Sequence, residues 1–200
     1  MAGNPGKLNE GPRLIATVAV MLIIFLAGSY VVAGSYVAML PLTMKPTVWL
    51  SFTFFIMAFT ASSFQILFRG TYGRWAMKNR RYIGLSFALA HFTHAVLVLS
   101  NLALTEASRT AGQLSGGGLA YVFLGLMALT SNNASVRKMG AKNWKLMHKV
   151  GSYYIWLIFV SRSINELPHN LPSGGFIVVF GLAALMFRIS AWLKQRKNKS

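Results

Sequence analysis

Two histidines, His91 and His94, lie three residues apart inside an apolar run that extends from Tyr82 to Leu104. Residues with this spacing share one face of an α-helix, so the two imidazoles would stand one turn apart on the same side. An imidazole without a partner is costly to bury in an apolar environment. We therefore expect chemistry at this pair, either as ligands or as groups that hydrogen-bond across helices to Ser, Thr, Asn101 or a backbone carbonyl.

The other two histidines lie in more polar segments. His148 stands between two lysines, four residues after Trp144, and we interpret it as a residue near the membrane surface. His169 lies in the proline-rich segment 167–172, which predicts a solvated loop.

The inventory of acidic and sulfur-bearing residues excludes several kinds of site. The chain has no Cys and no Asp, and its side-chain carboxylates are Glu10, Glu106 and Glu166. Disulfides, iron–sulfur clusters and thiolate metal sites within the chain are therefore excluded. A two-carboxylate hydrolase site or a carboxylate-bound magnesium site is disfavoured for the same reason. Glu166 is spaced to pair with Arg162 on one helix face, as an interfacial ion pair.

Long apolar runs dominate the chain: 54% of the 200 residues are hydrophobic and 12% are charged, with a mean hydropathy of +0.51. A soluble domain carries about twice that charged fraction. Pro41, Pro46, Pro168 and Pro172 fall between the runs, where we expect the helices to be interrupted. Six runs approach the ~17 to 25 residues of a membrane-spanning helix: Leu14 to Val32 (its apolar character continuing to Leu40), Val48 to Phe68, Tyr82 to Leu104, the shorter Gly117 to Thr130, Trp144 to Ser163, and Phe176 to Leu193.

The net charge of +17 is unevenly divided between the two sides of a six-span topology. All Lys and Arg residues except Lys45, Arg109 and Arg162 fall on the side that also holds both chain ends. This positive-inside pattern places the N and C termini in the cytoplasm. We therefore interpret the charge as a topology signal that meets anionic lipid headgroups, and we expect no nucleic-acid partner.

Together these patterns predict an all-α integral membrane protein, a bundle of six transmembrane helices that forms a single membrane domain over residues 1–200. We expect the first run to be retained as a helix rather than cleaved as a signal peptide. The Gly-rich segment from Thr105 to Gly118 predicts a flexible outer loop. No GxGxxG turn follows a strand, so we expect no dinucleotide-binding domain.

Three short patterns resemble the ferric-reductase-like transmembrane domain family, whose members include haem-binding membrane subunits of bacterial methionine sulfoxide reductases. The first is Arg80-Arg81-x-x-Gly84-Leu85 followed by nine residues and His94. The others are Leu129-Thr130-Ser131 at the end of the fourth run and Trp144-x-x-Met147-His148 at the start of the fifth. The resemblance covers about residues 48–165.

The resemblance implies a b-type haem between the third and fifth runs, which passes electrons across a bacterial inner (cytoplasmic) membrane. By matching position, His94 and His148 would be haem ligands, and His91 is an additional imidazole one turn away. Arg162 would then meet a haem propionate or an anionic substrate. The electron donor would be a separate protein or a quinol on the cytoplasmic side, because the chain has no flavin or nicotinamide domain. The chain would act as an oligomer or as one subunit of a complex, with no catalytic residue of its own assigned.

The chain departs from the family pattern at Ser161, where the family has a second histidine about thirteen residues after the first. Parallel third and fifth helices would set His94 level with Ser161 and His148 level with Arg80. The helical rise then separates the two histidines by roughly 20 Å, too far to be the two axial ligands of one iron.

Three interpretations follow from this departure. In the first, one haem is held by His94 or His91 with an unusual or missing second ligand. In the second, the fold persists without haem as a membrane scaffold or partner-binding protein. In the third, His91 and His94, with His169, hold a copper or zinc ion near the outer half of the membrane.

Overall fold

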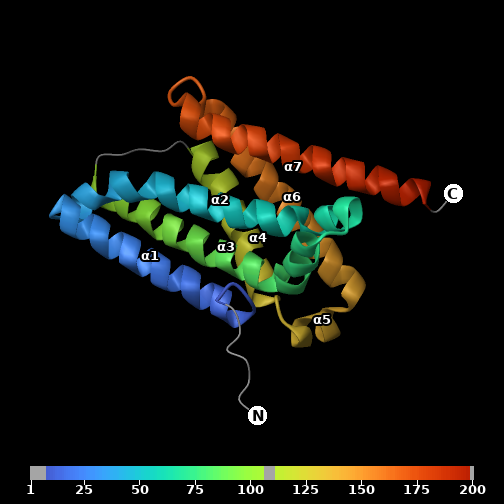
Figure 1. The fold of residues 1–200 in the computed structure, drawn as a ribbon. Coiled ribbons are helices and arrows are strands. Elements are labelled where there is room, and N and C mark those ends of the chain that lie inside the picture. Colours follow the sequence, from blue (N-terminus) through green and yellow to red (C-terminus); the bar gives the residue numbers. More distant parts are fainter. Residues whose placement is uncertain (1–7, 106–110, 199–200) are drawn as a thin grey trace, which may run out of the picture. The chain divides into compact units, whose positions relative to one another are not determined.

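The computed structural model of the chain is all-α and describes residues 8–105 and 111–198, apart from the side chains of 111–114. The described residues form seven helices (Figure 1): α1 (Pro12–Ala33), α2 (Tyr36–Phe68), α3 (Thr71–Leu104), α4 (Ala111–Leu129), α5 (Asn133–Met139), α6 (Ala141–Glu166) and α7 (Leu171–Lys197). These helices form two compact units. The first unit contains Met1–Ala58 and Trp75–Glu106, and the second contains Phe59–Arg74 and Ala107–Ser200.

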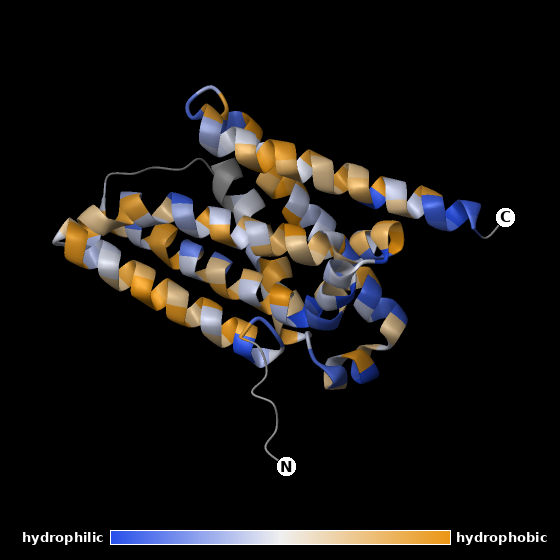
Figure 2. Cartoon of the chain, viewed as in Figure 1, coloured by the Kyte–Doolittle hydropathy of each residue, from blue (hydrophilic) through white to orange (hydrophobic). Residues whose placement is uncertain are grey.

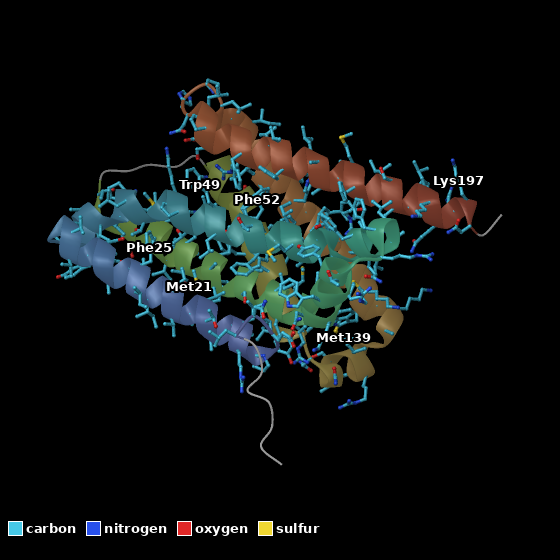
Figure 3. The ribbon with its side chains drawn as sticks, in the orientation of Figure 1. Met21, Phe25, Trp49, Phe52, Met139 and Lys197 are labelled. Carbon is cyan, nitrogen blue, oxygen red and sulfur yellow. The ribbon has the colours of Figure 1, made fainter. Side chains whose placement is uncertain are left out.

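The first unit consists of α1, most of α2 and most of α3, which lie side by side. Helix α1 buries Leu14, Val18 and Leu22, which are spaced four residues apart and therefore share one face. Its other faces remain apolar, with Val31 and Val32 about four-fifths exposed. Exposed apolar side chains of this density are typical of a helix that contacts lipid. Figure 3 marks Met21 and Phe25 on this helix and Trp49 and Phe52 on α2.

The prediction that Pro41 and Pro46 separate two spans is wrong, because α2 continues through both prolines. The chain turns earlier, after Ala33, where Gly34 adopts a left-handed conformation (φ 72°) and its N–H donates to the Tyr30 carbonyl at 2.9 Å. This is the usual glycine ending of a helix, since a left-handed backbone is strained for residues with a Cβ. In a bilayer, any break in helical hydrogen bonding is expensive, which favours continuing the helix past a proline.

The second unit is organised around α6, which packs against α4, α5 and α7. Gly174 of α7 allows the closest approach: a Cβ there would lie 2.6 Å from the Ser163 carbonyl oxygen of α6. The Trp156 indole of α6 donates to the Gly181 carbonyl of α7 at 2.9 Å. Small residues at this helix pair therefore bring the two backbones together, as is typical of packing in membranes.

The connection between the fourth and fifth apolar runs contains a helix that the sequence did not predict, α5. The side chain of Asn132 caps it by accepting from the Ser135 N–H at 2.8 Å.

Helix α4 begins at Ala111, so the predicted loop is wrong for residues 111–118, which are helical. The remainder of that loop after Thr105, residues 106–110, lies outside the described residues, as do the predicted topology charges Lys7, Arg109 and Lys199.

Four of the described helices, α1, α2, α3 and α7, are long and apolar enough to cross a membrane. Segment Ser115–Leu129 of α4 qualifies together with α5 as one broken span, bent by 104°, which raises the number to five. Helix α6 contains the fifth predicted run, but its first half carries three lysines and it falls outside this set. Figure 2 shows apolar residues along α1 and α7, with polar residues at the C-terminal end of α7. The chain is a multi-pass integral membrane protein.

Candidate functional site

His91 and His94 stand one turn apart on α3 in the first unit, as their spacing predicts. Their rings are stacked, with centroids 5.7 Å apart and planes inclined by 26°. The Phe87 ring lies beyond His91 at 5.5 Å. Both histidines are half-buried. The two imidazoles thus form one continuous aromatic column along α3.

Both imidazoles contact hydroxyl groups of α2. His91 Nδ1 lies 3.0 Å from Ser51 Oγ, and His94 Nδ1 lies 3.2 Å from Thr47 Oγ1. Thr47 and Ser51 are one turn apart, so two consecutive turns of α2 face two consecutive turns of α3. This confirms the expectation that the pair hydrogen-bonds across helices to Ser or Thr.

His148 belongs to a different cluster, in the second unit. Its Nε2 lies 3.3 Å from the hydroxyl of Thr130 at the end of α4, and the Trp144 ring lies 4.0 Å from its own ring. The Trp144 indole donates to the Thr130 carbonyl at 2.9 Å. This cluster joins the end of α4 to the beginning of α6 across the bend at α5. The ligand role that the resemblance implies for His148 stays a prediction.

The remaining predicted residues have simpler surroundings. Ser161 is half-buried, and its hydroxyl donates to the Ile158 carbonyl one turn back on α6 at 3.3 Å. His169 is exposed in the connection between α6 and α7, as predicted. Arg162 lies against α4, where a Cβ on Gly117 would be 3.9 Å from its guanidinium.

Among the described residues, no group of three or more His, Cys, Asp or Glu side chains is placed to hold a metal ion. A zinc or copper site needs a third ligand besides the His91–His94 pair. Within the described residues, the His91–His94 pair therefore provides at most two ligands for a metal ion.

One charged side chain inside the second unit has surroundings that sequence reasoning missed. Arg188 of α7 lies between the rings of Phe59 and Tyr153, with its guanidinium 4.2 Å and 5.0 Å from the two centroids. Its Nε donates to the Tyr153 hydroxyl at 3.1 Å, and Nη1 donates to the Phe59 carbonyl. The signal in the sequence is an arginine inside the sixth apolar run, on the cytoplasmic side of the predicted topology.

Fold and site together define a multi-pass helical membrane protein with a stacked histidine pair, each ring bonded to a neighbouring helix. The chain is similar to a subunit from Herminiimonas arsenicoxydans, the protein-methionine-sulfoxide reductase heme-binding subunit MsrQ. The two are 25% identical over 139 residues, a match that covers 63% of this chain and 62% of the relative. This similarity confirms the predicted resemblance to ferric-reductase-like membrane proteins. No protein-family model and no solved structure matches the chain.

Proposed function

We propose that the chain is a haem-binding membrane subunit, as the name of its relative suggests, and that it transfers electrons to a separate reductase. The observation that carries the proposal is the His91–His94 pair, in which each Nδ1 is already bonded to a hydroxyl of α2. Haem-ligating and metal-ligating histidines bind through one ring nitrogen while the other is hydrogen-bonded.

The residues of the first unit would hold a b-type haem through an imidazole of this pair. Imidazole is a common haem ligand, and a lipid-facing helical bundle supplies the apolar surroundings that exclude water. We assign the ligand role to His94, with His91 one turn away as the second imidazole of the site. His148 and Ser161 belong to the second unit, where His148 Nε2 contacts the Thr130 hydroxyl and Ser161 donates to the Ile158 carbonyl of its own helix.

When bound, haem would supply one-electron chemistry across the membrane. Helix α3 carries the two imidazoles, and the hydroxyl groups of α2 orient their rings.

The electron donor is a separate protein or a quinol that approaches the cytoplasmic side, where basic residues gather in the proposed topology. That topology has six spans, with α6 as the fifth, the broken α4–α5 segment as the fourth, and both termini in the cytoplasm. The chain then forms a single membrane domain with a ferric-reductase-like core over about residues 48–165.

A haem-free scaffold is the second candidate, because Ser161 stands where the family has a second histidine. A spectrum separates the two proposals. We expect the protein, purified in detergent after expression with a haem supply, to show Soret and α bands in a dithionite-reduced minus oxidised spectrum. The bands should be lost or shifted in His94→Ala and kept in His148→Ala. A wild-type protein without these bands would support the scaffold.

A further inference from the structure

The hydroxyl groups of Thr47 and Ser51 decide which nitrogen of each histidine carries a hydrogen. Ser51 Oγ lies 2.8 Å from the Val48 carbonyl oxygen and 3.0 Å from His91 Nδ1. A hydroxyl has a single hydrogen, and a carbonyl oxygen can only accept. Two oxygens 2.8 Å apart without a hydrogen between them would repel, so the hydroxyl donates to the carbonyl. Ser51 then offers only a lone pair to the ring, and His91 Nδ1 must be the donor.

The same reasoning applies one turn earlier on α2. Thr47 Oγ1 lies 2.8 Å from the Thr43 carbonyl oxygen, 3.0 Å from that of Met44 and 3.2 Å from His94 Nδ1. With its hydrogen directed to the carbonyls of its own helix, Thr47 also accepts from the imidazole. Because Thr47 and Ser51 are 1% and 0% exposed, solvent cannot take over either role.

We propose that Thr47 and Ser51 are positioning residues that hold His94 and His91 as Nδ1–H tautomers and so place the lone pair of each ring on Nε2. In a neutral imidazole one nitrogen is protonated and the other carries the lone pair, and only the latter can bind iron. The effect of these tautomers on haem binding rests on the proposed function. The tautomers themselves are a property of the protein without haem.

Thr43 provides a matched control on the same helix. It is fully buried, like Thr47, and its hydroxyl donates to the carbonyls of Met39 and Leu40 at 3.0 Å and 3.2 Å. Replacing Thr43 by Val therefore removes the same atom from the same helix, one turn away, without touching a histidine contact that the structure shows.

The test is solid-state NMR of protein labelled with ¹³C and ¹⁵N at histidine, reconstituted without haem in lipid vesicles. We expect Nδ1–H tautomers for His91 and His94 in the wild type. Thr47→Val should reduce the Nδ1–H population of His94, whereas Thr47→Ser and Thr43→Val should retain it. In haem titrations, Thr47→Val should bind roughly 10- to 100-fold more weakly, as is typical when the partner of a ligating histidine is removed.

Two results would overturn the inference: a wild-type His94 protonated on Nε2, or a Thr47→Val variant with wild-type tautomer and wild-type haem affinity. The NMR spectrum of the wild type shows which nitrogen of His94 is protonated, even if a variant fails to fold. A wild type that shows both Nδ1–H tautomers and takes up no haem would contradict the proposed function while leaving the tautomer assignment in place.

Discussion

The hydrogen bonds of His91 and His94 are compatible with both expected roles of the pair, as haem ligands and as groups that hydrogen-bond across helices. A bond to a buried hydroxyl removes the cost of an unpartnered imidazole, which is all that a structural histidine requires. The same bond fixes the ring for a ligand on the opposite nitrogen. A cross-helix hydrogen bond is therefore no argument against haem binding at this pair.

The sequence predicted the histidine pair and the kind of partner, but not Thr47 and Ser51 themselves. Helix α2 holds several hydroxyl residues, and which of them meet α3 depends on the rotation and register of two packed helices. Periodicity does not set these quantities here, since α2 is apolar on nearly every side. The contacts of Arg188 could not be predicted from the sequence either. Its partners Phe59 and Tyr153 come from α2 and α6, so the contacts depend on how separate helices pack.

Arg188 is expected to stabilise the second unit. Replacing it by Met should lower the free energy of unfolding by about 2 kcal/mol, since a cation–π contact and hydrogen bonds to Tyr153 and Phe59 are lost. Arg188→Lys should recover only part of this, because an ammonium lacks the planar fork. Denaturant unfolding in detergent measures the effect. The exposed Arg196, stacked on Trp192, is the control, and equal losses for Arg188→Met and Arg196→Met would contradict the assignment.

At the scale of elements, each of the six apolar runs lies in or overlaps one helix of the structure, but the helix ends differ from the run ends. Helix α3 begins at Thr71, well before the apolar run that starts at Tyr82. Hydropathy predicts the part of a helix that contacts lipid, but it does not predict how far the helix continues into polar residues. Helix α5 was missed because seven residues are too few for a periodic pattern, although its Asn cap was readable.

The α6–α7 pair offers a sharp test of close helix packing. Gly174→Ala should destabilise the protein by roughly 1–3 kcal/mol, because the new Cβ would meet a backbone oxygen that cannot move aside. Gly175 is the matched neighbour, since a Cβ there meets nothing within 4 Å. We expect Gly175→Ala to be neutral or slightly stabilising in thermal unfolding in detergent. If both variants unfold at the same temperature, α6 and α7 do not approach as the structure shows.

At the scale of the whole molecule, the charge asymmetry predicts the orientation in the membrane. A reporter fused after Ser200 should be active only in its cytoplasmic form, because the basic segments between runs two and three and between runs four and five resist translocation. A second reporter placed after His169 should be active only outside the cytoplasm. A C-terminal reporter found outside would refute the six-span topology, including the assignment of α6 as a span.

The proposed function requires the stacked pair on α3 to hold a haem, which the haem content of the purified protein measures. We would compare the pyridine haemochrome of wild type, the double variant His91→Ala/His94→Ala and His169→Ala, with folding checked by gel filtration and circular dichroism. We expect haem in the wild type and in His169→Ala, and almost none in the folded double variant. A folded double variant that retains the wild-type haem content would contradict haem binding by His91 and His94.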